Sequence, residues 1–307
     1  MRLGKEFIFI CFILLDAIIF FGMYQFSSGS GGQVFFARPV ITPIPTLFIE
    51  SPVKHPNISN ITLLYRLRGH NGYINFELSK DIYETFSETK HTYFFNSDNE
   101  VIQTMLENNT QDYYLKPLIN KIKMLSQNSD DQAKIAVSMI QHIPYDYEST
   151  RSTDWYFPYE TLYLNTGVCS DKSILLAYIL NELGYETVLF QFDDENHMAV
   201  GVKTSPEYDY RDSGYAFIET TQTAIITDVT EEFTSGRLLT SSPHFLKLHG
   251  GTKSLNVSEE FEDAVALNYF ESIGSKQNKS LDYDNYYAWY NISEKYDLFY
   301  EIRGRIK

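Results

Sequence analysis

The longest hydrophobic stretch of the chain lies near its N-terminus. Residues 7–24 are apolar apart from Asp16, and the basic residues Arg2 and Lys5 precede them. As a helix, these 18 residues are just long enough to cross about 30 Å of hydrocarbon. Asp16 near the centre would cost about 2.5–3.5 kcal/mol on insertion. We predict one N-terminal transmembrane helix within an anchor segment, residues 1–26.

The basic residues around this stretch predict its orientation. Arg2 and Lys5 precede it, and the first basic residue after it is Arg38. Because cytoplasmic flanks are the more basic ones, we expect a single-pass protein of the cell membrane with an extracytoplasmic C-terminal domain. A cleaved signal peptide is the alternative, since it also combines a charged start with an apolar run.

Beyond the anchor, the pattern loses its periodicity. Residues 27–60 are rich in Ser, Gly and Pro, a composition that resists helix and central strand alike. We interpret this segment as a stalk.

Regular patterns resume over residues 61–235, which we assign to one folded domain. Short apolar runs around Gly69, Asn71 and Gly72 are typical of a hairpin turn between two strands. Helical patterns follow over residues 113–125 and after a capping box at residues 129–132.

The centre of this domain combines one helix with several strands. Residues 173–183 are apolar almost all round and end at Gly184, which predicts a buried helix with a glycine C-cap. Strand-like runs then occupy residues 187–192, 197–202 and 215–221. The economical architecture is an α+β fold in which one helix packs on an antiparallel sheet.

The pattern weakens in the C-terminal part. Residues 259–270 fit a helix, whereas residues 283–306 are rich in tyrosine without a clean period. Residues 236–307 are therefore treated as a C-terminal extension of unknown role.

Composition excludes several classes of function. Forty acidic residues against 25 basic ones give a net charge of −15, and no basic cluster would bind phosphates, so nucleic acid is not an expected partner. We find neither a Cys/His spacing for zinc nor a phosphate-binding glycine loop, so no metal and no cofactor is expected.

Cysteine usage points to one free thiol. The chain has two cysteines, and Cys11 lies in the predicted membrane segment, so Cys169 has no partner for a disulfide. Cys169 stands where the central helix begins, and free N–H groups at a helix start favour a thiolate and can stabilise an oxyanion. The alternative is an inert, buried cysteine.

A base and a carboxylate follow in the next strands. His197 begins the second strand-like run, where it can reach a neighbouring helix start and act as a general base. Glu219 lies in the third run among apolar residues, where a buried carboxylate needs a partner and can orient the imidazole. The alternatives are a surface histidine beside an acidic loop and an exposed glutamate at a strand end.

These residues stand within an ordered series of motifs that resembles the transglutaminase-like superfamily. The resemblance spans about residues 66–233, and its motifs are Phe157-Pro158-Tyr159-Glu160, Gly167-Val168-Cys169-Ser170-Asp171, His197-Met198-Ala199-Val200 and Ile218-Glu219-Thr220-Thr221. It implies a papain-like core with Cys169 as nucleophile, His197 as base and Glu219 as orienting acid.

Two positions differ from the residues that are common in this superfamily, and one further residue matches them. Many members have Asp where Glu219 stands, and many have Asp where Val168 precedes the cysteine. The first change keeps the chemistry with one more methylene group, and the second removes a carboxylate beside the nucleophile. Trp155 occupies a place where relatives often have an aromatic residue lining the acyl site, although a tryptophan there can equally serve packing.

The chemistry implied by the resemblance is acyl transfer through a thioester. We expect a cysteine peptidase or amidase that acts on a peptide, a protein or a cell-envelope polymer. The alternatives are a transglutaminase that crosslinks proteins, and a non-catalytic envelope binding or adhesion module with the same fold.

Overall fold

The computed structural model describes residues 57–89, 98–149, 154–229, 239–277 and 282–298, all within one compact unit, Val53–Lys307. The predicted membrane segment and most of the predicted stalk lie outside the described residues, so both stay predictions. Within these ranges, no helix is both long and apolar enough to cross a membrane.

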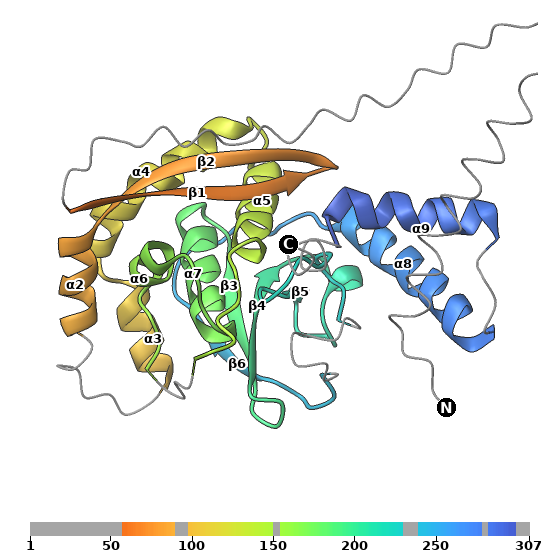
Figure 1. Cartoon of the computed structure of the whole chain (residues 1–307). Coiled ribbons are helices and arrows are strands. Elements are labelled where there is room, and N and C mark those ends of the chain that lie inside the picture. The colour runs from red at the N-terminus through yellow and green to blue at the C-terminus, as the bar shows by residue number, and fades with distance from the viewer. Residues whose placement is uncertain (1–56, 90–97, 150–153, 230–238, 278–281, 299–307) are drawn as a thin grey trace, which may run out of the picture. The chain divides into compact units, whose positions relative to one another are not determined.

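A long β-hairpin opens the described chain. Strand β1, Ile58–Leu67, pairs antiparallel with β2, His70–Ser79, and β1 packs against helix α5, Ser129–Gln141 (Figure 1). The turn consists of Arg68 and Gly69, which both have positive φ angles, as a type I′ hairpin turn requires.

The hairpin turn therefore lies earlier than the sequence pattern predicts, because Asn71 and Gly72 belong to β2. Gly72 is paired with Tyr65, and a Cβ atom at Gly72 would lie 2.2 Å from the Tyr65 ring. The glycine thus makes room for an aromatic ring across the strands rather than for a turn.

Helices cover the next part of the chain. They are α2, Lys80–Thr89; α3, Asp98–Leu106; α4, Asn109–Leu125; and α5, Ser129–Gln141. The helical patterns over residues 113–125 and after residues 129–132 are confirmed as α4 and α5. The predicted capping box is wrong in one respect, because Asn128 rather than Ser129 is the N-cap of α5 and accepts from the Asp130 amide. Helix α4 starts earlier than predicted because the side chain of Asn108 caps it by accepting bonds from the Thr110 and Gln111 amides.

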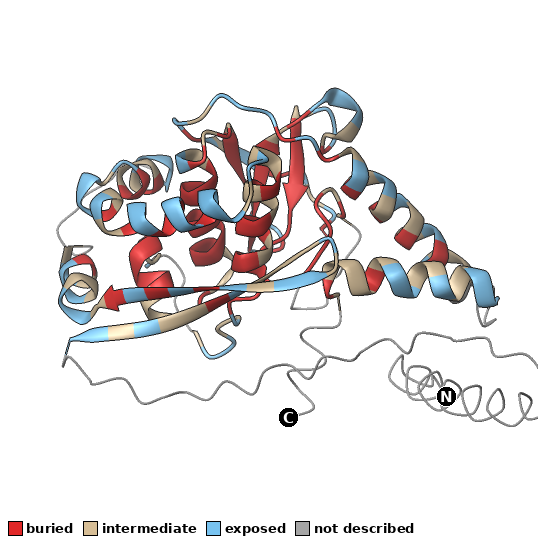
Figure 2. Ribbon diagram, turned by 90° about the horizontal axis from the view of Figure 1, so that it is seen from above, coloured by how far each residue is buried: buried red, intermediate tan, exposed pale blue. Residues whose placement is uncertain are grey.

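The buried helix predicted from the apolar run at residues 173–183 is confirmed, and it begins at Cys169 as expected. It is α7, Cys169–Glu182, and a short helix α6, Pro158–Leu164, precedes it. Gly184 follows α7 with a φ of 95°, the left-handed conformation expected of a glycine beyond a helix end. Every residue from Ser170 to Leu180 is buried, and buried residues are red in Figure 2.

An antiparallel sheet of four strands packs against α7, with the order β5-β4-β3-β6. Its strands are β3, Thr187–Phe192; β4, His197–Lys203; β5, Tyr215–Ile218; and β6, His244–Lys247. The predicted α+β arrangement of one central helix on an antiparallel sheet is therefore present.

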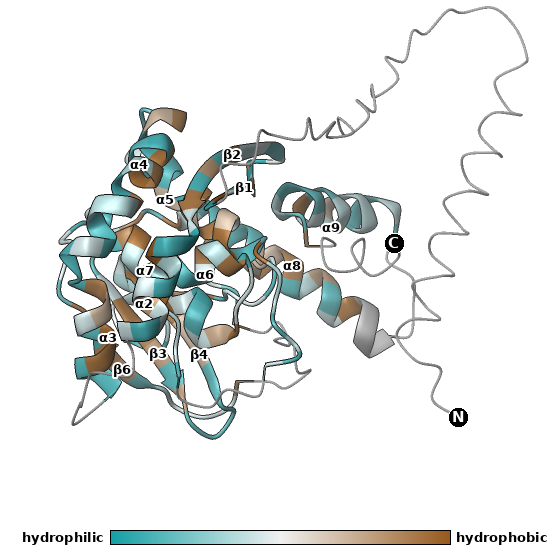
Figure 3. Ribbon diagram, turned by 60° about the vertical axis from the view of Figure 1, so that its left-hand side comes forward, coloured by the Kyte–Doolittle hydropathy of each residue, from teal (hydrophilic) through white to brown (hydrophobic). Residues whose placement is uncertain are grey.

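The two faces of this sheet contact different cores. Leu189, Val200 and Ile218 point to the large core around α7, whereas Phe190 and Phe217 belong to a smaller aromatic core on the other face. The strict alternation follows from the two-residue period of a strand. Hydrophobic residues accordingly colour much of α7 and β3 in Figure 3, and each fully buried large apolar side chain contributes about 1.5–3 kcal/mol.

The C-terminal part contains α8, Ser258–Gln277, and α9, Tyr283–Tyr296. Helix α8 extends the predicted helix at residues 259–270, and α9 occupies the tyrosine-rich segment. Helix α8 contacts the rest of the unit through the ion pair of Lys134 with Glu260 at 2.7 Å, and α9 through a hydrogen bond from the Gly69 amide to the Lys295 main-chain oxygen at 3.1 Å. The boundary between domain and extension at residue 235 stays a prediction.

Candidate active site

Cys169 is the first residue of α7, at the junction between an extended segment and the helix. Val168, the N-cap residue, has φ −83° and ψ 179°, and the Cys169 side chain is half-buried and forms no disulfide. The first N–H groups of a helix have no acceptor within the helix and carry partial positive charge. A thiolate or an oxyanion at this position is therefore favoured.

Asp171 closes the first turn of α7. Its carboxylate accepts hydrogen bonds from the main-chain amides of Val168, at 3.1 Å, and Tyr156, at 2.9 Å. The side chain is fully buried, so it shapes the cysteine turn and fixes the preceding loop.

His197 and Glu219 form a buried pair. His197 is the first residue of β4, Glu219 directly follows β5, and Nε2 of His197 lies 2.9 Å from Oε2 of Glu219. The two residues are only 4% and 3% exposed. Because an ionised carboxylate only accepts, Nε2–H is the donor, which leaves Nδ1 for a second partner.

The second partner of the imidazole is Cys169, since a side-chain hydrogen bond joins the two residues. The structure thus brings together the three residues that the sequence singled out. They come from a helix start, a strand start and a strand end, in the order thiol, imidazole and carboxylate.

The strand that carries Glu219 ends earlier than predicted. Residues 215–221 were expected to be one strand, but β5 stops at Ile218. Oε1 of Glu219 accepts bonds from the amides of Thr220 and Thr221, at 2.9 and 2.8 Å, and from the Thr221 hydroxyl, at 2.7 Å. Because these amides donate to the carboxylate, they cannot donate to a neighbouring strand. The chain therefore turns around Glu219 and holds its side chain in place.

The charges of this pair stabilise each other. Burial raises the pKa of Glu219, but the His197 charge and the bonds from His197 and Thr221 outweigh it, so the pKa lies below its usual range. Burial lowers the pKa of His197, but the Glu219 charge and the bonds to Cys169 and Glu219 raise it above its usual range. An imidazolium beside Cys169 at neutral pH is the result.

Polar side chains that sequence reasoning missed hold these elements in register. Ser173 on α7 donates to the main-chain oxygen of Met198 in β4 and lies 3.0 Å from the Thr220 hydroxyl. Gln141 at the end of α5 donates to the main-chain oxygens of Glu219, at 2.9 Å, and Ala224, at 3.0 Å.

Lys172 adds a link between α7 and α5. Its Nζ donates to the main-chain oxygen of Ile143 at 2.6 Å, and the residue is fully buried. One sequence signal could have suggested this: a helix that is apolar almost all round has no solvent face, so the polar residues at its start must find internal partners.

Tyr145 is a further residue near the thiol that the sequence did not single out. Its backbone forms a bridge with Gly167, and the Asp146 amide donates to the Gly167 oxygen at 3.1 Å. Burial raises the pKa of the Tyr145 hydroxyl to about 12, and the charges of Cys169 and Glu219 add to this. The hydroxyl therefore stays protonated beside the site.

Trp155 precedes Tyr156 in the chain, and the Tyr156 main-chain amide donates to the Asp171 carboxylate. The Trp155 side chain is partly exposed and packs against the same large core as Cys169. Its proposed place along the acyl site stays a prediction.

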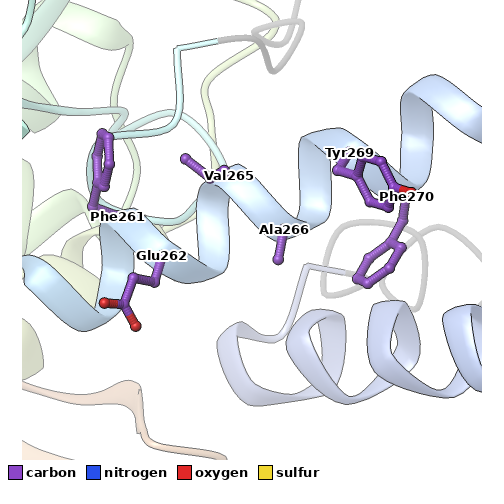
Figure 4. A pocket seen from close by; sticks show the side chains of 6 residues that line it. All are labelled: Phe261, Glu262, Val265, Ala266, Tyr269 and Phe270. Carbon is purple, nitrogen blue, oxygen red and sulfur yellow. The ribbon is translucent and has the colours of Figure 1, made fainter.

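Two further observations concern other kinds of site. Among the described residues, no group of three or more His, Cys, Asp or Glu side chains is placed to hold a metal ion. The apolar pocket in Figure 4 is lined only by residues of α8, between Phe261 and Phe270, and therefore shares no residue with the Cys169 site.

Three solved structures are similar to parts of this chain. Calcium-bound LapG of Legionella pneumophila is 17% identical, and the match covers 60% of this chain and 97% of LapG with a TM-score of 0.30. A candidate cysteine protease from Cytophaga hutchinsonii is 14% identical, and the match covers 52% of this chain and 60% of that protein with a TM-score of 0.30. A TGase is 18% identical, and the match covers 54% of this chain and 45% of the TGase with a TM-score of 0.27. The chain thus spans 60% of the Cytophaga protein and 45% of the TGase.

Part of the chain matches a protein-family model. No curated protein matches the chain. Residues 113–230 match the family model described as a transglutaminase-like domain, and this range includes Cys169, His197 and Glu219. The resemblance noted from the motifs is confirmed by this match to the transglutaminase-like family model over residues 113–230.

Proposed function

We propose that this chain is a membrane-anchored, extracytoplasmic cysteine enzyme that transfers acyl groups through a thioester and hydrolyses peptide or amide bonds. The observation that carries the proposal is the buried hydrogen bond between His197 and Glu219, with Cys169 on the same imidazole ring. A thiol, a base and an orienting carboxylate in this order are the arrangement that nucleophilic acyl transfer requires.

In the first half of the proposed reaction, His197 holds the proton of the Cys169 thiol, and the thiolate attacks the carbonyl carbon of the substrate. The C–S bond forms as the carbonyl becomes an oxyanion, which the free N–H groups at the start of α7 can stabilise. Collapse of this intermediate breaks the C–N bond, His197 gives its proton to the leaving amine, and a thioester remains.

In the second half, His197 takes a proton from water, and the resulting hydroxide attacks the thioester carbon. The C–S bond then breaks, the acid is released and Cys169 returns to its starting state. Throughout, Glu219 keeps the imidazole oriented and stabilises its positive form, while its own carboxylate stays fixed by Thr220 and Thr221.

Water and a second amine compete for the thioester. Cys169 is half-buried rather than enclosed, which favours hydrolysis because water can reach the thioester. Crosslinking of proteins by an amine acceptor is the second candidate, and it would require a substrate that excludes water from the site.

The proposed location rests on the sequence. The apolar residues 7–24, the basic residues before them and the proline-rich segment after them support a single-pass anchor with the domain outside the cytoplasm. The expected substrates in that compartment are a peptide, a protein or a cell-envelope polymer.

Alkylation of Cys169 tests the proposal most directly. Residues 55–307, which contain Cys169 as their single cysteine, would be treated with iodoacetamide across about pH 4 to 9 and analysed by mass spectrometry. The His197→Ala variant would be compared with His244→Ala, because the His244 side chain is 74% exposed and far less enclosed.

We expect rapid alkylation below about pH 7, loss of at least about tenfold in rate in His197→Ala, and no loss in His244→Ala. Reaction only near about pH 8.5, the ordinary thiol value, would remove the enzyme proposal. The non-catalytic binding module would then be the better reading of the fold.

A second measurement separates hydrolysis from crosslinking. Wild type and Cys169→Ala would be incubated with a glutamine-containing protein substrate and a fluorescent primary amine, and both product acid and incorporated amine would be measured. Hydrolysis predicts release without incorporation, whereas incorporation that depends on Cys169 would favour the transglutaminase alternative.

A further inference from the structure

The Glu219 loop, residues 219–229, lies between the main core and the C-terminal helices α8 and α9, which pack against each other (Figure 1). Within this loop, Ile225 is fully buried in an apolar cluster with Ala264 and Leu267 of α8. Further side chains that pack against the cluster come from α9 and the segment directly after it, namely Trp289, Ile292, Tyr296 and Leu298. Ile226, which follows Ile225, belongs instead to the large core around α7. The loop is therefore anchored on both sides.

Polar contacts hold the same loop from the same two sides. The Gln141 side chain, at the end of α5, donates to the main-chain oxygens of Glu219 and Ala224. The Thr223 hydroxyl donates to the main-chain oxygen of Asp297, directly after α9, at 2.8 Å, and Thr223 is itself buried. Breaking such a bond leaves a buried polar group without its partner, which is costly. The start of the loop is thus tied to the end of α9 as well as to α5.

The tied residues adjoin the turn that holds the candidate catalytic carboxylate. The amides of Thr220 and Thr221 donate to Oε1 of Glu219, and Thr223 follows shortly after them in the chain. A displacement of Thr223 would therefore move the donors on which the carboxylate depends, and with them the group that is bonded to His197. Misplacing a catalytic group by about 1 Å can cost about 100-fold in rate.

We propose that Ile225 and Thr223 are positioning residues for acyl transfer, and that α8 and α9 hold Glu219 in its working orientation through them. The inference rests on the proposed function, because Glu219 acts there through His197. It assigns a role to the C-terminal helices, for which the sequence pattern indicated none. If these helices only added stability, loss of the Ile225 packing would lower the free energy of unfolding but leave the reactivity of Cys169 in the folded protein unchanged.

Alkylation of Cys169 separates these two roles. The full chain would be treated with iodoacetamide at a series of pH values that includes about pH 6, where an ordinary thiol is almost wholly protonated. Digestion and mass spectrometry would then quantify the peptide that contains Cys169 apart from the one that contains Cys11. Urea unfolding of each variant would give its stability.

The matched control for Ile225→Ala is Ile122→Ala. Both isoleucines are fully buried, so both changes remove the same atoms from an apolar environment. Ile122 lies in α4 beside Lys123, whose Nζ donates to the main-chain oxygen of Glu182, the last residue of α7. The control therefore weakens the core near the end of α7 that is opposite to the candidate nucleophile.

We expect Ile225→Ala to be alkylated at least about tenfold more slowly than the wild type at about pH 6, with a pH profile displaced toward the ordinary thiol value of about 8.5. Ile122→Ala should lose stability in urea but keep the wild-type rate and profile. Ile225→Val, which keeps most of the packing, should stay within about threefold of the wild-type rate.

Two milder variants serve if Ile225→Ala does not fold. Thr223→Val removes only the hydroxyl that bonds to Asp297, and Leu267→Val shortens the α8 side chain in the Ile225 cluster. Each should slow alkylation at about pH 6 by at least about threefold.

The outcomes distinguish this inference from the proposed function. A wild-type rate in folded Ile225→Ala or in both milder variants, or equal slowing in Ile122→Ala, would overturn the positioning role and leave the proposed function intact. A wild-type chain whose Cys169 reacts only near about pH 8.5 would remove the proposed function, and the positioning role with it.

Discussion

Nε2 of His197 donates to Oε2 of Glu219 at 2.9 Å, and both side chains are almost completely buried. A buried pair of this kind is costly to break, because removing one partner leaves the other charge without compensation. The pair therefore links the stability of the domain to the protonation of its candidate active site.

The pH dependence of stability follows from the directions of the two pKa shifts. The raised pKa of His197 gives a contribution that is complete below the ordinary histidine value of about 6.5 and is lost as pH rises through the folded-state value. The lowered pKa of Glu219 gives a contribution that is present above about 4.3 and is lost as pH falls through the folded-state value.

We therefore expect the pair to stabilise the fold most between about pH 4.3 and 6.5, and less on either side. Urea unfolding at a series of pH values would compare wild type with the double variant His197→Gln/Glu219→Gln, which removes both charges together. The difference in unfolding free energy should peak in that window. A difference that does not change with pH would contradict the coupling.

Glu219→Gln should reduce the reactivity of Cys169 while keeping the fold. The neutral amide no longer stabilises the imidazolium, so alkylation at about pH 6 should slow by at least about tenfold. Glu207→Gln is the control, because Glu207 is exposed in the loop before β5. Equal rates in wild type and Glu219→Gln would mean that the carboxylate does not act on the thiol through His197.

Gln141→Leu should destabilise the domain by about 1–3 kcal/mol, because the buried main-chain oxygens of Glu219 and Ala224 lose their donor. The exposed Gln127→Leu is the matched control. Urea unfolding gives the free energy. If Gln141 also positions Glu219, alkylation of Cys169 should slow in Gln141→Leu at a urea concentration where both proteins remain folded.

Glu195 holds the segment before β6 against the turn that precedes His197. Its carboxylate accepts bonds from the amides of Thr240 and Ser241, at 2.8 and 2.9 Å, and hydrogen bonds from Ser241 and Thr240 hold the pKa of Glu195 at about 2. In Glu195→Ala, these two amides should exchange with deuterium at least about tenfold faster. The neighbouring Asp194→Ala should leave their exchange unchanged.

Gly201→Ala should destabilise the sheet by about 1–3 kcal/mol through overpacking. A Cβ atom at Gly201 would lie 2.6 Å from the Val188 side chain and 2.7 Å from the Phe190 ring. Combining Gly201→Ala with Phe190→Leu should restore part of the loss, because the smaller side chain makes room. Urea unfolding of the wild type, both single variants and the double variant gives a double-mutant cycle. If the changes in unfolding free energy simply add, the contact between residues 201 and 190 is unimportant.

Local patterns in the sequence were sufficient for the main elements and for the three central side chains. The apolar run after Ser173 specifies a helix that must be buried, and the alternating runs that follow specify strands, because burial imposes the period of each element. Cys169 and His197 could be singled out because each stands where a predicted element begins, and Glu219 because a carboxylate among apolar residues needs a partner.

Only the tertiary structure decided what surrounds these residues. Gln141 and Glu219 are 78 positions apart, and Ser173 and Thr220 are 47 apart, so no local pattern reveals that they bond. The turn at Arg68 and the early end of β5 belong to the same class. Hydrophobic period is a property of neighbouring residues, whereas the partner of a buried polar group depends on how distant elements pack.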